Sequence, residues 1–201
     1  MIKPMLFNTD MVRAILDGRK TVTRRVVKPQ KEEMRIGTYI TGFNKKVIGA
    51  CSSNGFVTVS PHQPGDILYV REAWSITDNL WNGMDMILYR ADYNGNQYSN
   101  IRWRPSIHMP KEIVRIFLRV KDVRVERLQD ITEKQAQAEG FYKGWKATEH
   151  SSMALTAKQA FMWTWDYTIK PADRIIYGWL PNPWVWVIEF ERCEKPNECS
   201  H

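Results

Sequence analysis

The sequence predicts an α+β fold, in which a mostly antiparallel, barrel-like β-sheet is accompanied by a few helices. Short stretches rich in Val, Ile, Thr and aromatic residues recur between turn residues, whereas three segments have the spacing of a helix. The 201 residues contain no internal repeat, low-complexity tract or linker between two apolar blocks. Because this length is sufficient for one buried core, we expect a single domain over residues 1–201.

The first helix and the strand that follows it have the clearest local signals. Side-chain oxygens at residues 8–10 are suited to cap a helix start, and apolar residues follow at helical spacing. Gly18 suits the left-handed conformation that ends a helix. The next segment, KTVTRRVV at 20–27, is rich in Thr and Val and predicts a strand. A glycine turn therefore connects a short helix to a strand that begins with Lys and Thr.

The remaining elements are predicted from the same kinds of signal. Further strands are expected at residues 46–50, 55–60, 66–71, 84–90, 113–128 and 183–191. A Pro-Gly-Asp turn at 64–66 precedes the third of these strands. Thr132 and Gln135 form a capping box that begins a second helix, which ends near Gly140. A third helix is expected over residues 156–167.

The composition is that of a globular protein and excludes several other classes. Apolar residues make up 43% of the chain and charged residues 25%, which excludes a disordered tail or a fibre. No apolar run approaches the roughly 20 residues of a membrane-spanning helix, and the N-terminus lacks the apolar stretch of a signal peptide. We therefore expect a cytoplasmic protein with no membrane partner.

Cysteine and histidine spacing gives no support for a metal site. Cys51, Cys193 and Cys199 include no C-x-x-C pair, which is consistent with reduced thiols. None of the histidines lies three or four residues from another histidine or a cysteine; they are His62, His108, His150 and His201. We expect neither a metal ion nor a cofactor.

Tryptophan is unusually abundant, and two interpretations of it remain open. The nine residues are Trp74, Trp81, Trp103, Trp145, Trp163, Trp165, Trp179, Trp184 and Trp186. They fill core layers in the first interpretation, because Trp is costly to leave exposed. In the second interpretation some of them stack on nucleobases.

The net charge of +7 is concentrated in two segments. Residues 1–31 contain eight basic and two acidic residues, and residues 101–127 contain eight basic and three acidic residues. If both segments contribute to one face, they form a patch that attracts a polyanion such as a nucleic acid. The alternative is that they form the solvated face of a sheet.

The segment GRKTVTRR at 18–25 is the first of three clusters with side chains suited to chemistry. Its charged and hydroxyl side chains are Arg19, Lys20, Thr21, Thr23, Arg24 and Arg25. The positive field of the arginines disfavours the Lys20 ammonium and lowers the pKa of this lysine. A neutral amine can take the proton of a nucleophilic hydroxyl, at Thr21 or Thr23. The alternative is a solvated strand edge whose charges prevent aggregation.

The other two clusters each contain a carboxylate. In PGDILYVREAW, strand alternation directs Arg71 and Glu72 to opposite faces, so one of them faces the core or a cleft. The alternative is a structural ion pair. In ITEKQAQAEGF, Glu139 lies at the end of a short helix, where its carboxyl group is suited to hold a substrate amide or ammonium group. An ordinary surface glutamate is the alternative there.

Taken in order, the motifs ILDGRKTVTRR, PGDILYVREAW and ITEKQAQAEGF resemble those of the ASCH domain, a member of the PUA-like superfamily. With RPSIHMP at 104–110 and NPWVWVIEFE at 182–191, the longer form is similar to ASCH-domain proteins often carried by bacteriophages and prophages. The resemblance implies a PUA-like β-barrel with helices at its openings and a cleft beneath the first helix. It also implies association with RNA or modified nucleosides.

Some small bacterial ASCH-domain proteins are amidohydrolases that remove the acetyl group from N4-acetylcytidine. The resemblance implies catalytic roles for Lys20, Thr23 and Glu139. Lys20 would activate the Thr23 hydroxyl or a water molecule, and Glu139 would position and protonate the leaving amine. Backbone N–H groups near Gly18, or Arg25, would stabilise the oxyanion. We expect substrate binding by Arg19, Thr21, Arg24, Arg25, Arg71, Glu72 and Trp74.

Those hydrolases are about half as long as this chain. We expect the extra residues in insertions within 30–62, 75–110 and 143–181, which contain many of the tryptophans. Such insertions could cap the cleft, widen the choice of substrate, or replace catalysis with binding. The alternative function is therefore a non-catalytic RNA-binding module, such as a phage regulatory protein. A ribonuclease is less well supported, because no histidine pair suggests general acid–base cleavage of RNA.

Overall fold

The fold is known from a computed structural model. It describes residues 1–31, 33–40, 46–53, 55, 57–78, 85–93, 100–142, 144 and 155–196. Five residues considered above lie outside this description, and they are Trp81, Trp145, His150, Cys199 and His201.

The chain divides into two compact units, each assembled from segments that are distant in sequence. Unit 1 comprises residues 1–18, 65–119 and 191–201, and unit 2 comprises residues 19–64 and 120–190. Unit 1 contains 11 basic and 11 acidic residues, whereas unit 2 contains 18 basic and 11 acidic residues. Unit 2 therefore carries the whole net charge of +7. That the chain forms one domain stays a prediction.

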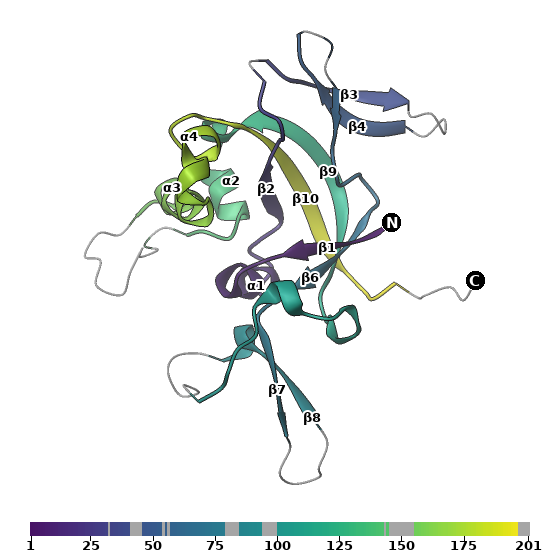
Figure 1. Cartoon of the computed structure of the whole chain (residues 1–201), viewed down its shortest axis with the longest axis vertical. Helices are drawn as coiled ribbons and strands as arrows, with labels where there is room; N and C mark the ends of the chain where they lie inside the picture. The colour runs from purple at the N-terminus through teal and green to yellow at the C-terminus, as the bar shows by residue number, and fades with distance from the viewer. Residues whose placement is uncertain are drawn as a thin grey trace. The chain divides into compact units, whose positions relative to one another are not determined.

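The described part of unit 1 contains a small sheet, a hairpin and one α-helix (Figure 1). Its elements are β1 (Ile2–Leu6), α1 (Thr9–Leu16), β6 (Ile67–Arg71), β7 (Trp74–Asp78), β8 (Asp85–Tyr89), η1 (Arg90–Asp92), η2 (Ser106–His108), η3 (Lys111–Ile113) and the first residues of β9 (Phe117–Arg127). Strand β1 pairs in parallel with β6, and β6 pairs in antiparallel with β9. Strands β7 and β8 form a separate antiparallel pair.

Unit 2 contains most of the helices and the rest of the strands (Figure 1). Its elements are β2 (Val22–Val26), β3 (Arg35–Ile40), β4 (Lys46–Cys51), β5 (Val57–Val59), the remainder of β9, η4 (Leu128–Asp130), α2 (Glu133–Ala138), α3 (Ala157–Thr168), η5 (Pro171–Asp173), α4 (Arg174–Tyr177) and most of β10 (Trp184–Cys193). Strands β9, β10 and β2 are neighbours in that order, and β10 is antiparallel to β2. Strands β3, β4 and β5 form an antiparallel sheet.

The helix starts follow the local signals in the sequence. The Asn8 side chain accepts a hydrogen bond from the Met11 amide at 2.9 Å and caps α1, and Gly18 ends this segment at a φ of 74°. Thr132 and Thr156 each form a complete capping box, which begins α2 and α3 respectively. All three predicted helices are therefore confirmed.

The described elements confirm the α+β class, and every predicted strand has a counterpart. The pattern did not predict β1, β3, β7 or α4. Pro4 argues against a strand at residues 2–6, but β1 is the first strand in its sheet order, and an edge strand tolerates a missing N–H group. The described strands form sheets of five, three and two strands, with no closed ring among them.

Most of the described tryptophans pack against other side chains. Trp74, Trp165 and Trp186 are buried, whereas Trp163 is exposed. In unit 2 the centroid of the Phe161 ring lies 5.8 Å from the ring centroids of both Phe141 and Trp165. The packing interpretation therefore holds for the three buried tryptophans.

Candidate active site in unit 2

A short backbone bridge brings the first and third sequence motifs together. Lys20 and Glu139 face each other in an isolated antiparallel bridge, and the Thr21 amide donates to the Ala138 carbonyl at 2.9 Å. Glu139 is the residue at which α2 ends, directly before Gly140 at a φ of 100°. The start of β2 and the end of α2 therefore lie side by side, although Glu139 lies 119 positions after Lys20 in the sequence.

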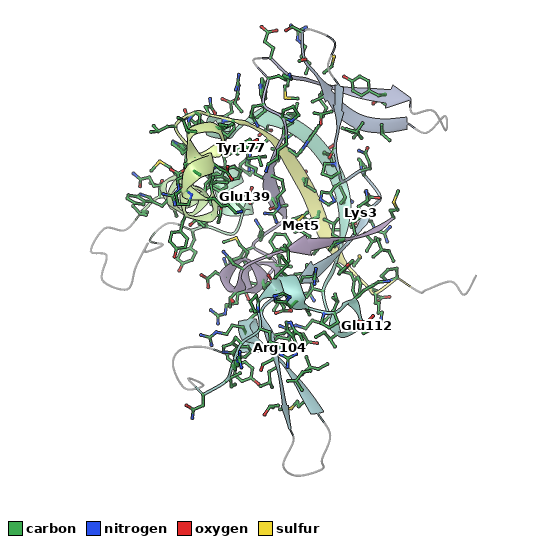
Figure 2. All side chains as sticks on the ribbon, viewed as in Figure 1. Lys3, Met5, Arg104, Glu112, Glu139 and Tyr177 are labelled. Atoms are coloured by element: carbon green, nitrogen blue, oxygen red, sulfur yellow. The ribbon has the colours of Figure 1, made fainter. Side chains whose placement is uncertain are left out.

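Lys20 and Glu139 form a buried ion pair. Glu139 is labelled in Figure 2. Each residue is 3% exposed. The Lys20 Nζ donates to Glu139 Oε2 at 2.6 Å, to the Val22 carbonyl at 2.8 Å and to the Glu139 carbonyl at 2.9 Å. Because an ammonium group has three N–H bonds, these three acceptors satisfy it completely.

Arg24 is a second buried cation on the same carboxylate. Its Nη1 donates to Glu139 Oε1 at 3.2 Å, and its Nη2 donates to Glu126 Oε2 at 3.2 Å. The two carboxylate oxygens of Glu139 are thus held by two different cations. The Nε of Arg24 is buried and has no hydrogen-bond acceptor within the described part of the chain. A buried donor of this kind is costly and calls for an explanation.

The electrostatic environment lowers the pKa of Lys20. Burial of the ammonium is the largest cause, and the positive charges of Arg25 and Arg24 act in the same direction. The Glu139 carboxylate acts in the opposite direction. The predicted direction is confirmed, although desolvation contributes more than the neighbouring arginines do.

The two predicted hydroxyl nucleophiles, Thr21 and Thr23, differ in burial. Thr23 is buried within β2, opposite Ile188 of β10, whereas Thr21 precedes the strand and is exposed. Strand alternation directs Thr23 to the face of β2 opposite that of Val22 and Arg24. The hydrogen-bonded group of Lys20, Arg24 and Glu139 is therefore built on one face of the strand.

An exposed cation, Arg19, and an exposed aromatic residue, Tyr142, lie close in sequence to Lys20 and Glu139 respectively. Arg19 donates from Nη1 to the Gly140 carbonyl at 2.9 Å, and its guanidinium carbon lies 6.0 Å from the centre of the Tyr142 ring. Tyr142 is 53% exposed, so the ring offers a face to solvent. Sequence reasoning did not select Tyr142 or Glu126, although an aromatic residue three positions after Glu139 was a usable signal.

The predicted substrate-binding residues of the second motif belong to unit 1 and have contacts there. Glu72 is 1% exposed and accepts from Arg115 at 2.9 and 3.1 Å, which confirms that one residue of the Arg71–Glu72 pair faces inward. Burial raises the pKa of Glu72, and the Arg115 guanidinium opposes this. Arg71 donates from Nε to the Met109 carbonyl at 2.9 Å, and Trp74 packs in a buried cluster that includes Met109.

Comparisons of the chain with models of protein families, with curated proteins and with solved structures found no significant match. Among the described residues, no helix is long and apolar enough to cross a membrane. The same residues contain no group of three or more His, Cys, Asp or Glu side chains arranged to hold a metal ion.

Proposed function

We propose that the protein is an ASCH-type amidohydrolase that acts on N4-acylated cytidine, as a nucleoside or within RNA. A PUA-like barrel for the fold is part of the same proposal. The observation that carries it is the buried contact of 2.6 Å between Lys20 Nζ and Glu139 Oε2, two residues that the sequence motifs pair in catalysis.

The chemistry follows from a proton shift within this pair. Lys20 Nζ transfers one proton to Glu139 Oε2, which lies 2.6 Å away. Burial lowers the pKa of Lys20 and so favours its neutral amine. The amine then takes a proton from an attacking water molecule as the new C–O bond forms at the amide carbonyl. Thr23 has no role in this step, because it lies on the opposite face of β2. Glu139 returns a proton to the departing nitrogen as the C–N bond breaks.

The overall reaction consumes one water molecule for each amide bond that is cleaved. Direct attack by water releases cytidine and a carboxylic acid. The buried Nε of Arg24 is suited to donate to the oxyanion of the tetrahedral intermediate, which would give this donor an acceptor during the reaction.

Two features of unit 2 support a nucleoside or RNA as the substrate. The unit carries the whole net charge of +7, which attracts polyanions. The exposed Tyr142 ring, beside the Arg19 guanidinium, is suited to stack with a nucleobase.

The test is hydrolysis of N4-acetylcytidine by the purified protein, followed as cytidine release by chromatography. We expect Lys20→Met to abolish release. Lys134→Met is the matched control, because Lys134 is exposed on α2 and lies outside the hydrogen-bonded group. Circular dichroism shows whether each protein is folded. No cytidine from the folded wild-type protein, or full activity in folded Lys20→Met, would refute the proposal.

One observation favours the alternative of a non-catalytic RNA-binding module. All three N–H bonds of the Lys20 ammonium are used by acceptors of the protein, as in a structural lysine. In that case RNA affinity falls with increasing salt and Thr23→Ala leaves it unchanged, while no cytidine is released.

A further inference from the structure

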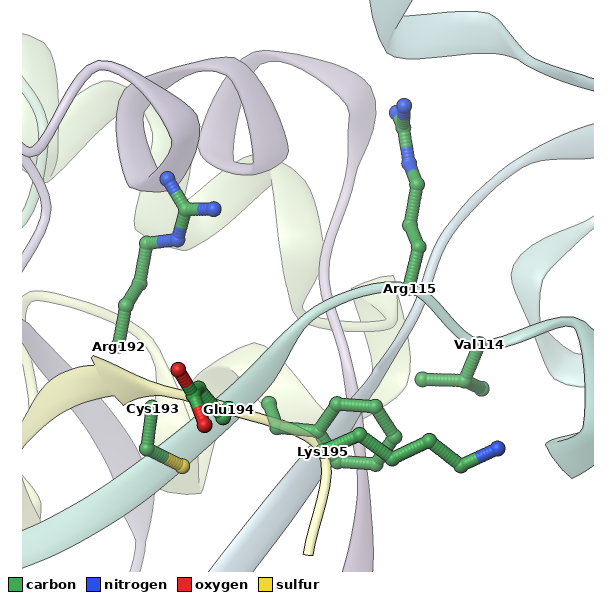
Figure 3. Close-up of a pocket in the computed structure, with 7 residues that line it drawn as sticks. Val114, Arg115, Arg192, Cys193, Glu194 and Lys195 are labelled. Carbon is green, nitrogen blue, oxygen red and sulfur yellow. The ribbon is translucent and has the colours of Figure 1, made fainter.

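We propose a second ligand site, in unit 1, that binds a small organic anion with an apolar body. The site is a cavity of about 590 Å³ between the segment that enters β9 and the end of β10 (Figure 3). This volume lies within the range of small-molecule sites in proteins, roughly 300–1,000 Å³. It is independent of the proposed hydrolase, because every lining residue belongs to unit 1.

The apolar part of the cavity is packed against a buried cluster. Val114 and Phe117 line it, and both belong to a buried cluster with Trp74 and Met109. Side chains that are packed on one side by a core keep their conformation without a ligand, which lowers the entropic cost of binding. These two residues therefore provide a preformed surface for the body of a ligand.

The charged part of the lining contains cations that have no carboxylate partner among the described residues. Arg115 is compensated, because Glu72 and Asp92 accept its hydrogen bonds at 2.7–3.1 Å. Arg192, by contrast, makes a single hydrogen bond, from Nη1 to the Leu16 carbonyl at 3.4 Å, among the described residues. Lys195 has no hydrogen bond or ion pair within the same part of the chain.

The two cations lie at different edges of the cavity. In Figure 3 the side chains of Arg192 and Lys195 start near the end of β10 and extend in different directions, with the carboxylate of Glu194 between them. Unit 1 as a whole has no net charge, so two cations without a carboxylate partner in the described part of the chain are a local feature of this cavity.

The ligand class follows from these groups. A carboxylate or phosphate accepts charge-assisted hydrogen bonds from Arg192 or from Lys195, at either edge of the cavity. The apolar body lies on Val114 and Phe117, and Glu194 accepts from a hydroxyl or amino group of the ligand. A nucleoside monophosphate and an aromatic carboxylic acid both satisfy this description, and the experiment below separates them.

The thiol of Cys193 lines the cavity and reports occupancy. The full chain is treated with iodoacetamide, with and without cytidine 5′-monophosphate or 1-naphthoate, and alkylation is followed by peptide mass spectrometry. We expect at least one anion to slow alkylation of Cys193 roughly tenfold and to leave Cys51 unaffected, while the uncharged cytidine gives no protection. The protecting anion identifies the ligand type.

Variants of the two cations decide whether the anion is recognised as proposed. Arg192→Gln combined with Lys195→Gln removes the protection, and Lys111→Gln, which alters an exposed lysine of unit 1 outside the cavity lining, retains it. Equilibrium dialysis of both anions against the same proteins gives a second reading that does not depend on the thiol. If neither anion binds, or if binding survives the double substitution, the proposal is wrong.

Discussion

Glu139 is the residue on which the candidate active site depends, since its single carboxylate holds two buried cations. Glu139→Gln leaves the charges of Lys20 and Arg24 buried without that partner. Removal of one member of a buried ion pair typically costs about 3–5 kcal/mol of stability. We expect a loss of this size in the free energy of unfolding, measured in urea.

Glu112→Gln serves as the control for this measurement. Glu112 is an exposed residue of η3, and its substitution is expected to change the unfolding free energy by less than about 0.5 kcal/mol. An equally small effect of Glu139→Gln would show that the buried pair contributes little to stability.

Tyr142 allows a test of nucleobase stacking that is separate from catalysis. Loss of an aromatic ring from a stacking site weakens binding by roughly 1–3 kcal/mol per base. We expect Tyr142→Ala to weaken the binding of N4-acetylcytidine to an inactive Lys20→Met protein, measured by isothermal titration calorimetry. Tyr167→Ala is the matched control, because Tyr167 is 87% exposed on α3. Equal affinities of the two variants would exclude stacking on Tyr142.

At the level of elements, the start of α3 depends on a side chain from α2. Glu133 accepts hydrogen bonds from the amides of Ala157 at 2.7 Å and Lys158 at 3.0 Å, which are the first two residues of α3. These bonds lower the pKa of Glu133. Together with the Thr156 capping box, they satisfy donors that a helix start leaves unpaired.

Glu133→Gln is therefore expected to destabilise the protein by about 1 kcal/mol at neutral pH, the usual cost of losing a helix cap. A carboxylate whose pKa is lowered by folding stabilises the fold above its ordinary pKa, and this contribution is lost as pH falls through the lowered value. Urea unfolding at neutral and acidic pH checks this. The wild type and variant should converge in acid, whereas a constant difference would contradict the assignment.

The exposed Asp130 of η4 provides the control for the same series, as Asp130→Asn. Its effect on the unfolding free energy is expected to be small at both pH values.

The elements themselves show which signals are local. The Thr132 capping box was predicted from four consecutive residues, whereas β1, which contains Pro4, became a strand through its pairing with β6.

At the level of the whole molecule, the charge is divided unevenly between the two units. Because unit 2 carries all of the net +7, we expect binding of single-stranded RNA to release counterions, so that affinity falls linearly with salt on logarithmic scales. Fluorescence anisotropy with a labelled oligonucleotide at several salt concentrations measures the slope. A flat response would argue against binding through the phosphate backbone.

The sequence by itself determined the α+β class, the helix starts at Asn8, Thr132 and Thr156, and the turn at Gly18. These features depend on residues within a few positions of each other, because caps and left-handed turns are satisfied locally. The motifs also pointed to Lys20 and Glu139 as site residues. No local signal predicted that these two side chains would contact each other.

Tertiary structure decided the partners of those residues. It buried Lys20 against a carboxylate 119 positions away, placed Arg24 on the second oxygen of that carboxylate, and brought Arg19 to Tyr142. It also separated the second motif, with Arg71 and Glu72, into unit 1. The reason is physical: the energy of a charged group depends on its burial and on its nearest counterion, and pairing between distant segments determines both.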